Sequence, residues 1–504
     1  MILASINEAN FEYDIHSLIQ AFFPGREVLV RVFSREELLK RADETELLFV
    51  IRYGARDIRM SLYEGPGAGN AAAEAQVDID PADRRETKNR LKQTLYRLLS
   101  DYSGRTLPWG TLTGIRPVKI PMSMLEDGKS NDEIRDYMRG TYLATDEKID
   151  LSIEIAKREQ KLLAAIDYED GYSLYIGIPF CPSTCLYCSF PSFSIEMWRD
   201  RVEEYLDALG REIEAMALQM GDRRVNSVYI GGGTPTSLSP KQLDRLLAEI
   251  GAQFHLNDAE GRIAYGKNGL LEFTVEAGRP DSITREKLKI LLNHNVSRIS
   301  INPQTMCEKT LKLIGRNHTV EQTRQAFFLA REMGFDNINM DLIVGLPEET
   351  IDDVRYTMEE IAGLGPDSVT VHSLAVKRAA KLRMEHENYE HLHMENTWDI
   401  IRLTAKRCRE MGLFPYYLYR QKNTAGNFEN VGYAVPGKEG IYNILIMEEK
   451  QTILALGAGA TTKAVFDQGN RIERVGNVKD VGIYIDRVDE MIERKKKFLE
   501  KYEQ

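Results

Sequence analysis

Hydrophobic residues follow two alternating patterns from residue 172 onward. Short apolar runs predict strands, and the longer stretches between them, in which apolar residues recur every three or four positions, predict helices. The predicted strands cover 172–178, 226–231, 271–277, 297–302, 337–344 and 367–373, and the predicted helices lie near 196–220, 239–253, 284–294, 319–333 and 350–363. Successive strand–helix units predict a parallel sheet with helices outside it, an α/β fold that forms either a barrel or a partial barrel.

The two ends of the chain show other patterns. Residues 1–63 alternate strand-like runs with one apolar helix near 14–23, and the Gly- and Ala-rich stretch 64–75 predicts a loop. After residue 375 the pattern predicts a helix near 395–412 and shorter strands near 413–419, 441–447 and 452–457. We therefore expect three domains: an N-terminal α+β domain of unassigned role over 1–165, the α/β domain over 166–374, and a small C-terminal α+β domain over 375–504.

Composition narrows the class of protein. The 504 residues are 43% apolar and 28% charged, and the formal net charge is −11. Nucleic-acid binding usually requires a basic field, so the bulk charge argues against an RNA or DNA partner. No apolar run of about 18 residues is present to span a membrane, and the opening residues carry acids where a signal peptide would carry Lys or Arg. We expect a cytoplasmic protein.

Three of the five cysteines lie within the segment 181-CPSTCLYCSF-190. The C-x3-C-x2-C spacing is wrong for a disulfide framework and typical of a metal site, with a zinc knuckle as the alternative. Zinc sites take four ligands, and no fourth Cys or His follows at finger spacing. Three thiolates suit a 4Fe–4S cluster with one iron left open to a small molecule, because a fully ligated cluster takes four. Cys307 and Cys408 are typical of small, half-buried apolar residues.

Polar or glycine-rich residues accompany the ends of successive predicted strands. The segment 231-GGGTPT-236 ends the second strand, Glu276 lies at the end of the third, Gln304 follows the fourth, and Asp341 lies in the fifth. In parallel βα folds the chemistry gathers at the C-terminal strand ends. Glycines let the backbone approach a ligand closely. A carboxylate in an apolar strand end requires a partner, so Glu276 pairs either with a ligand or with Arg279.

The three-cysteine segment resembles the signature of the radical S-adenosylmethionine (radical SAM) enzymes. The segments SLYIGIPFCPSTCLYCSF, GGGTPT, RISINPQTM, IGRNHT and MDLIVGLP resemble, in order and spacing, the oxygen-independent coproporphyrinogen III dehydrogenase branch of that superfamily. The long N-terminal extension and 417-YLYRQKNTAGNFENVGYA-434 are most similar to its Z-type (HemZ) subfamily. The resemblance implies a partial (β/α)6 TIM-like barrel as the radical SAM core, and a C-terminal domain that covers the substrate.

The resemblance also implies roles for individual residues. In the family the cluster passes one electron to S-adenosylmethionine, which is cleaved to methionine and a 5′-deoxyadenosyl radical. The matching residues are the cluster ligands Cys181, Cys185 and Cys188, the catalytic Tyr175 beside the cluster, Gly232, Gly233 and Thr234 around the methionine moiety, Glu276 at a first S-adenosylmethionine, and Gln304, Arg316 and Asp341 at a second. From its residue type alone, Arg316 is either a solvated surface charge or a carboxylate-binding residue.

The implied reaction is the oxidative decarboxylation of two propionates of coproporphyrinogen III to give protoporphyrinogen IX in porphyrin and heme biosynthesis. The implied cofactors are a 4Fe–4S cluster and one or two S-adenosylmethionine molecules. The implied electron donor is a reduced flavodoxin- or ferredoxin-type protein, and we expect a monomer. A tetracarboxylate substrate needs cationic partners, for which the candidates are Lys377, Arg378, Lys381, Arg383, Arg420 and Lys422, with Arg420 and Lys422 preferred as substrate-binding residues.

The sequence departs from its relatives at a few positions. Phe190 replaces a cysteine and Gly177 a histidine of the N-type enzymes, and both changes bear on substrate handling rather than on cluster ligation. A haem chaperone is one alternative function, since such relatives share the cysteine core. They carry a His-Asn-x-x-Tyr-Trp stretch in which this chain has Tyr442 for the histidine and Ile446–Met447 for the Tyr-Trp pair, so the expected haem ligand is missing. Another radical SAM enzyme acting on a tetrapyrrole is the second alternative.

Overall fold

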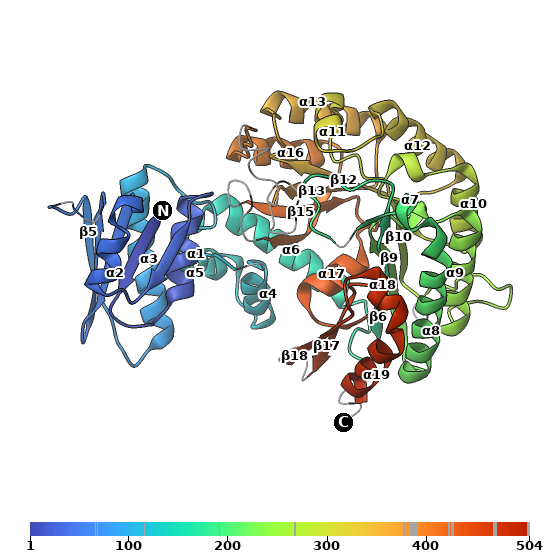
Figure 1. Ribbon diagram of the computed structural model, residues 1–504, viewed down its shortest axis with the longest axis horizontal. Coiled ribbons are helices and arrows are strands. Elements are labelled where there is room, and N and C mark those ends of the chain that lie inside the picture. The colour runs from blue at the N-terminus through green and yellow to red at the C-terminus, as the bar shows by residue number, and fades with distance from the viewer. Residues whose placement is uncertain are drawn as a thin grey trace. The chain divides into compact units, whose positions relative to one another are not determined.

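The structure, a computed structural model, describes residues 1–65, 67, 69–114, 116–190, 192–266, 269–375, 380, 382, 392–421, 424, 428–466 and 471–500. The chain divides into two compact units (Figure 1). The first contains residues 1–157 and 419–429, and the second contains residues 158–418 and 430–504. The division into three domains that the sequence suggests stays a prediction.

The first unit is built on a mixed sheet. β1 (Ile2–Ile6) pairs in parallel with β2 (Val28–Arg31) and β3 (Leu47–Tyr53), and β4 (Asp57–Tyr63) and β5 (Ala73–Asp78) continue the sheet in antiparallel order. Apolar residues of α1 (Glu12–Phe22) and α3 (Arg84–Ser103) share a buried core with this sheet. The other helices are α2 (Arg35–Lys40), α4 (Lys119–Glu126), α5 (Asn131–Tyr142) and α6 (Asp146–Leu163), the last of which continues into the second unit.

A buried ion pair ties the late segment 419–429 to the first unit. The Glu429 carboxylate accepts hydrogen bonds from Lys148 Nζ at 2.6 Å and from Trp109 Nε1 at 2.8 Å. The side chains of Lys148 and Glu429 are 2% and 1% exposed. Charges so far from water are tolerated only when they are paired and hydrogen-bonded. This contact therefore holds the segment 419–429 against the earlier part of the first unit.

The second unit contains the predicted parallel sheet. Its strands in chain order are β6 (Tyr172–Ile178), β9 (Val225–Gly232), β10 (Glu272–Glu276), β11 (Arg298–Ser300), β12 (Ile338–Val344) and β13 (Ser368–Ser373), each parallel to the next. The helices α8 (Val202–Met220), α9 (Pro240–Gln253), α10 (Arg285–Asn293), α12 (Val320–Met333) and α13 (Ile351–Leu364) lie around its outer side (Figure 1). The order of strands does not close, because β14 (Phe414–Arg420) and β18 (Arg471–Gly476) lie at opposite ends of it. The predicted α/β fold with an open barrel is confirmed.

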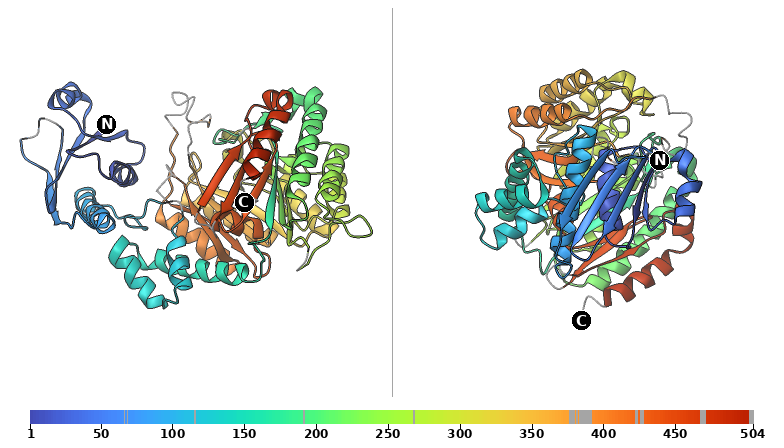
Figure 2. Two further views of the ribbon diagram at one scale, coloured as in Figure 1. Left: turned by 90° about the horizontal axis from the view of Figure 1, so that it is seen from below. Right: turned by 90° about the vertical axis from the view of Figure 1, so that its left-hand side faces the viewer.

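Strands from the C-terminal part of the chain extend the same sheet at both ends. β15 (Glu429–Ala434) pairs antiparallel with β13 and has β14 beyond it, whereas β16 (Thr452–Leu456) pairs in parallel with β6. β17 (Thr461–Phe466) and β18 follow β16 in antiparallel order. The helices here are α16 (Trp398–Glu410), α18 (Val481–Asp486) and α19 (Val488–Leu499), and the last two pack against α8 (Figure 2).

The predicted strand near 441–447 is wrong, because these residues form the helix α17 (Ile441–Glu448). A short apolar run does not by itself distinguish a buried strand from a buried helix. The deciding contact comes from β10, where the Glu272 carboxylate accepts from the backbone N–H groups of Ile441 at 2.7 Å and Tyr442 at 3.3 Å. A carboxylate at a helix N-terminus satisfies unpaired N–H groups and opposes the helix dipole, so a residue far away in sequence stabilises this helix.

Local sequence explains where three outer helices begin. Ser239, Thr319 and Thr350 form capping boxes at the starts of α9, α12 and α13. These helices follow the loops that leave the strands, so the C-terminal strand ends and their loops gather at one edge of the sheet. Within the described part of the chain, no helix is both long and apolar enough to cross a bilayer.

Candidate active site

The three clustered cysteines lie on a loop that follows the C-terminal end of β6, residues 181–190, which we call the cysteine loop. Cys181 ends the short strand β7 (Phe180–Cys181), which pairs with β8 (Phe193–Ser194) and closes the base of the loop. Cys185 is buried, Cys181 and Cys188 are half-buried, and all three thiols are free. Burial raises the pKa of Cys181 to about 11, against the opposing hydrogen bond with Thr234, and burial also raises the pKa of Cys188. Metal binding at these thiols therefore requires release of their protons.

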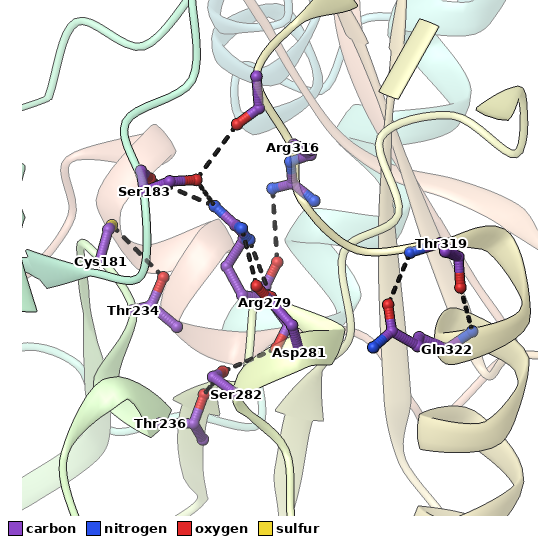
Figure 3. A network of polar contacts seen from close by, with 12 residues as sticks. Cys181, Ser183, Thr234, Thr236, Arg279, Asp281, Ser282, Arg316, Thr319 and Gln322 are labelled. Carbon is purple, nitrogen blue, oxygen red and sulfur yellow. Dashed lines mark hydrogen bonds and ion pairs between the residues drawn. The ribbon is translucent and has the colours of Figure 1, made fainter. Parts of the chain in front are cut away.

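A buried arginine holds the cysteine loop in place. Arg279, 2% exposed, donates from Nη1 to the carbonyl oxygen of Ser183 at 3.2 Å and to its hydroxyl at 3.0 Å. Its Nε and Nη2 donate to the two carboxylate oxygens of Asp281 at 3.1 and 2.9 Å (Figure 3). This two-point contact fixes the guanidinium plane. Arg279 thus pairs with Asp281 rather than with Glu276, which was the alternative partner suggested by the sequence.

The same loop is joined to two other loops at this edge of the sheet. The Ser183 hydroxyl donates to the Gly315 carbonyl at 3.2 Å. On the other side of Arg279, the Ser282 hydroxyl donates to the Arg279 carbonyl at 2.7 Å and lies 2.6 Å from the Thr236 hydroxyl (Figure 3). The glycine-rich segment, the turn after β10 and the cysteine loop therefore form one continuous polar network.

The glycine-rich segment approaches the first cysteine so closely that a side chain does not fit. A Cβ atom at Gly233 would lie 2.6 Å from the Phe180 carbonyl oxygen and 3.0 Å from Cys181 Sγ. Gly232 has a φ of 108°, a backbone conformation that L side chains rarely adopt. The Thr234 hydroxyl lies 3.4 Å from Cys181 Sγ. The structure brings the predicted Gly232, Gly233 and Thr234 directly against the cysteine loop.

Glu276 ends β10 with its half-buried carboxylate hydrogen-bonded to the Tyr229 hydroxyl of β9. Burial raises the pKa of Glu276 to about 7; the Tyr229 hydrogen bond opposes this shift, and the nearby Asp341 carboxylate adds to it. A carboxyl group with a pKa near neutrality at the end of a buried strand is characteristic of functional sites.

A stack of three tyrosines lies beside this carboxylate, and nothing in the sequence pattern indicated it. Tyr229 stacks on Tyr442 of α17 with ring centroids 4.6 Å apart, and Tyr175 stacks on both rings at 6.3 and 6.4 Å. Stacked rings of this kind stabilise one another beyond their burial alone. The predicted catalytic residue Tyr175 is therefore held by residues of two other elements.

Asp341 lies in β12, and Gln304 lies in the segment after β11, where it forms an isolated bridge with Leu342 of β12. Asp341 accepts from Asn339 Nδ2 at 2.7 Å and lies 3.8 Å from His372 Nε2. Burial raises the pKa of Asp341, but these contacts outweigh it and leave the pKa below its ordinary value. Gln304 has a φ of 68°, unusual for a residue with a side chain, and its buried Oε1 has no hydrogen-bond partner within the described residues. A strained backbone and an unsatisfied buried oxygen are typical of a ligand site.

Arg316 lies beneath the cysteine loop with His318 nearby. The guanidinium donates to the Asn302 carbonyl and, at 3.4 Å, to the Gly278 carbonyl, and the residue is 6% exposed, which excludes a solvated surface charge. His318 is 2% exposed, and neither ring nitrogen has a hydrogen-bond partner in the described part of the chain. Burial, followed by the Arg316 and Arg279 charges, lowers the pKa of His318 to about 3, so the ring is neutral. Sequence reasoning did not single out His318, although it lies in the same short segment as Arg316.

Comparison with known proteins decides the family. The family model of the Radical SAM superfamily matches residues 175–361. The oxygen-independent coproporphyrinogen-III oxidase-like protein HemZ of Bacillus subtilis is 41% identical over 82% of this chain and 82% of its own length. The chain belongs to the radical SAM superfamily. Within it, the chain belongs to the branch of HemZ and of the oxygen-independent coproporphyrinogen III oxidases.

Two further radical SAM comparisons bear on the fold and on the function. The solved structure of coproporphyrinogen III oxidase (HemN) from Escherichia coli has a TM-score of 0.50 and 24% identity, and the match covers 66% of this chain and 73% of that one. It supports the radical SAM fold. The heme chaperone HemW of Bacillus subtilis is 32% identical over 63% of this chain and 76% of its own length. Family membership alone therefore does not separate an enzyme from a chaperone.

The polar groups at the strand ends fit the cofactors of a radical SAM protein. Buried atoms without hydrogen-bond partners among the described residues, on Gln304, Arg316 and His318, indicate a polar ligand at this edge. A structural zinc site takes four ligands, whereas three thiolates suit a 4Fe–4S cluster that leaves one iron open to a small molecule. The free cysteines and the bare glycine backbone beside them favour the cluster.

A cavity of about 370 Å³ opens beside this site. Tyr175 and Gly232 contribute to its wall, so it adjoins the edge where the radical SAM cofactors are expected. Of the positions where this chain departs from the N-type enzymes and from the chaperones, Gly177, Phe190, Tyr442 and Ile446 line it. These substitutions change the shape and polarity of one cavity and leave the cysteines untouched.

Of the two predicted substrate-binding residues, the structure describes Arg420. Arg420 belongs to the first unit, where it is 4% exposed, donates to the Leu112 carbonyl and lies over the Trp109 ring. Its role in substrate binding stays a prediction. The other predicted cations lie outside the described residues, namely Lys377, Arg378, Lys381, Arg383 and Lys422.

Proposed function

We propose that this protein converts coproporphyrinogen III to protoporphyrinogen IX without oxygen, by oxidative decarboxylation of two propionate side chains. The observation that carries the proposal is the cavity that joins Tyr175 and Gly232 to the positions Gly177, Phe190 and Tyr442. It offers a small-molecule substrate a place directly beside the cysteine loop, and its volume is in the usual range of small-molecule sites. Similarity to HemZ and to HemN supports the tetrapyrrole as substrate.

The protein residues in this proposal bind, orient and shield. Cys181, Cys185 and Cys188 hold the cluster, which together with S-adenosylmethionine supplies the radical that removes a hydrogen atom from the substrate. Gly232, Gly233 and Thr234 offer backbone and hydroxyl groups to the methionine moiety. Glu276 binds a hydroxyl or amine of a first S-adenosylmethionine, and Gln304, Arg316 and Asp341 bind a second.

The local chemistry supports two of these roles. Glu276, with a pKa of about 7, loses its proton readily when a cationic or hydroxyl group binds beside it. The unsatisfied Oε1 of Gln304 gains the hydrogen bond that it lacks in the protein alone. The proposal also includes a reduced flavodoxin- or ferredoxin-type electron donor, a monomeric protein and a cytoplasmic location.

An anaerobic assay tests the proposal. The cluster is reconstituted in the full chain, which is then given reductant, S-adenosylmethionine and coproporphyrinogen III. We expect protoporphyrinogen IX together with 5′-deoxyadenosine, and neither product from the Cys185→Ala variant. Formation of 5′-deoxyadenosine without decarboxylated porphyrinogen would discard the substrate and keep the radical chemistry.

A haem chaperone is the competing function, because a heme chaperone is among the relatives. Against it, Tyr442 stands where the chaperones carry histidine, and its ring stacks on those of Tyr229 and Tyr175. The same protein, mixed with haem and passed through a desalting column, distinguishes the two functions. One haem retained per chain, without porphyrinogen turnover, would favour the chaperone.

A further inference from the structure

Two cations face each other at the cavity, on strands that the sequence did not connect with a site. Lys463 of β17 and Arg474 of β18 are directly opposed in the antiparallel register, and both line the cavity. Like charges directly opposite each other destabilise a strand pair. The fold therefore holds two positive charges together at the wall of a recess, which is the arrangement that an anionic ligand requires.

One carboxylate lies between the two cations. Glu449, directly after α17, reaches Lys463 Nζ at 3.6 Å and Arg474 Nη2 at 2.9 Å through the same oxygen, Oε1. Lys463 Nζ also donates to the Ile446 carbonyl in the last turn of α17 at 2.8 Å, where the helix dipole favours a cation. These three charged groups together carry a net charge of +1. The Arg474 side chain remains 55% exposed, so its guanidinium is accessible to a ligand.

The rest of the cavity wall is mostly apolar and runs across neighbouring strands. Tyr175 and Gly177 of β6 share a face with Ala455 and Ile453 of β16, because residues two apart point to the same side of a strand. Ile453 pairs in turn with Lys463. Since adjacent strands are about 4.8 Å apart, the strands of the two cations lie two and three strand spacings across the sheet from β6, roughly 10 and 14 Å.

We propose that Lys463 and Arg474 form a carboxylate-binding site that holds a propionate of the substrate while another part of the substrate lies beside Tyr175 and Gly232. That the bound carboxylate belongs to the porphyrinogen substrate rests on the proposed function, whereas the cationic site itself does not. An apolar body with an anionic tip matches a wall of isoleucine and alanine that ends in a lysine and an arginine. Anchoring a distant carboxylate also fixes which part of the ligand lies at the cysteine edge.

The chain offers a matched control on the same strand. Arg471 of β18 is 52% exposed in its side chain, close to the 55% of Arg474, but it pairs with Glu473 and does not line the cavity. The variants are Arg474→Gln, Arg471→Gln and the charge-retaining Arg474→Lys. Lys463→Gln is a fourth variant, whose folding is checked by its unfolding midpoint because Lys463 is buried.

The experiment measures binding without turnover. Coproporphyrin III, the stable oxidised tetracarboxylate, is titrated into reconstituted full-length protein at low and high salt, and the dissociation constant is read from porphyrin fluorescence. We expect Arg474→Gln to weaken binding by about tenfold and to reduce its salt dependence, as expected for loss of a charge-assisted contact. Arg471→Gln should stay within about twofold of the unaltered protein, and Arg474→Lys should recover most of the loss.

A tetramethyl ester of the same porphyrin separates charge from shape. If the cations bind carboxylates, the ester should bind equally to the unaltered protein and to Arg474→Gln. Unchanged coproporphyrin binding by both Arg474→Gln and a folded Lys463→Gln would overturn the inference. Tight, cation-dependent binding without any protoporphyrinogen formation would instead overturn the proposed function and leave the carboxylate site standing.

Discussion

Arg279 binds Ser183 twice through a single guanidinium nitrogen, and this contact joins the turn after β10 to the middle of the cysteine loop. The two residues are 96 positions apart. The remaining guanidinium nitrogens donate to Asp281, which fixes the orientation of the arginine side chain toward the loop. Arg279 is therefore a positioning residue: it sets where Cys181 and Cys185 lie without being a ligand.

Arg279→Met should impair assembly of the cluster. The loop loses two hydrogen bonds, and Asp281 loses its cationic partner in a half-buried place, which we expect to cost about 2–4 kcal/mol locally. The measurement is iron and sulfide content after anaerobic reconstitution, with the 400 nm absorbance of the cluster as a second reading. Arg285→Met, an exposed arginine on α10, is the control and should bind iron normally. Equal iron content in the two variants would show that the cluster assembles without the contact between Arg279 and Ser183.

Gly233→Ala should affect the same site through a steric clash. The added Cβ would lie 2.6 Å from a carbonyl oxygen and 3.0 Å from Cys181 Sγ, closer than real Cβ contacts, so the glycine-rich segment or the loop must shift. We expect S-adenosylmethionine binding, followed by equilibrium dialysis of the reconstituted protein, to weaken at least tenfold. Gly363→Ala provides the contrast, because no atom lies within 4 Å of its Cβ position inside α13. That change should stabilise the protein by about 0.5–1 kcal/mol and leave binding unaffected.

Much of the fold and part of the site could be predicted because they depend on local patterns. The strands β6 and β9 to β13, the cysteine loop and the position of Glu276 at a strand end all follow from apolar spacing and from the rule that chemistry gathers at C-terminal strand ends. Helix α17 was misassigned because its N-terminus is stabilised by Glu272, 169 residues earlier in the chain. An apolar run of that length carries no information about such a partner.

The site residues that the sequence did not reveal also depend on partners that are distant in the chain. His318 and the stack of Tyr442 on Tyr229 become visible only when distant elements are packed together. The cations at the cavity are the clearest example. Clustering of charges along the sequence indicated Arg420 and Lys422 as substrate-binding residues. Lys463 and Arg474 are instead brought together by the register of β17 with β18. Register depends on the turn and on the buried face of each strand, and composition does not reveal it.

The raised pKa of Glu276 predicts a dependence of stability on pH. Because the folded-state pKa is about 7 against an ordinary value of 4.5, the folded state binds the proton more tightly than the unfolded state. Its contribution to stability is therefore fully present below about pH 4.5 and is lost as the pH rises through about 7. The cofactor-free Glu276→Gln variant should gain on the order of 2–3 kcal/mol over the unaltered protein at pH 8 and little at pH 4.5.

Urea unfolding of cofactor-free protein across this pH range measures the effect. Glu214→Gln, an exposed residue on α8, is the control and should show the same pH profile as the unaltered protein. A Glu276→Gln curve that runs parallel to the unaltered protein at every pH would contradict the raised pKa. The comparison needs no cluster, so it is independent of the radical chemistry.

The cavity wall depends on a buried ion pair behind it, which gives the last prediction. Glu212 of α8 and Lys495 of α19 are both fully buried, with Nζ 2.6 Å from Oε1. The same carboxylate accepts from the Gly457 backbone N–H at 2.8 Å and from the Tyr484 hydroxyl at 2.6 Å, and Lys495 also donates to the Ala455 carbonyl at 2.6 Å. Because the turn that begins at Gly457 supplies Ala458, Gly459 and Ala460 to the cavity wall, this network connects α19 to the cavity.

Lys495→Met should leave the Glu212 charge buried without its cation and destabilise the protein by about 3–5 kcal/mol. The neighbouring Lys496→Met changes a partly exposed lysine on the same helix and should stay within about 0.5 kcal/mol. Urea unfolding compares the two, and the coproporphyrin titration then asks whether the cavity has changed. If Lys495→Met is destabilised but binds porphyrin as tightly as Lys496→Met does, the pair is a stabilising element only. A parallel loss of porphyrin affinity below the unfolding transition would show that α19 shapes the cavity through Glu212 and the Gly457 turn.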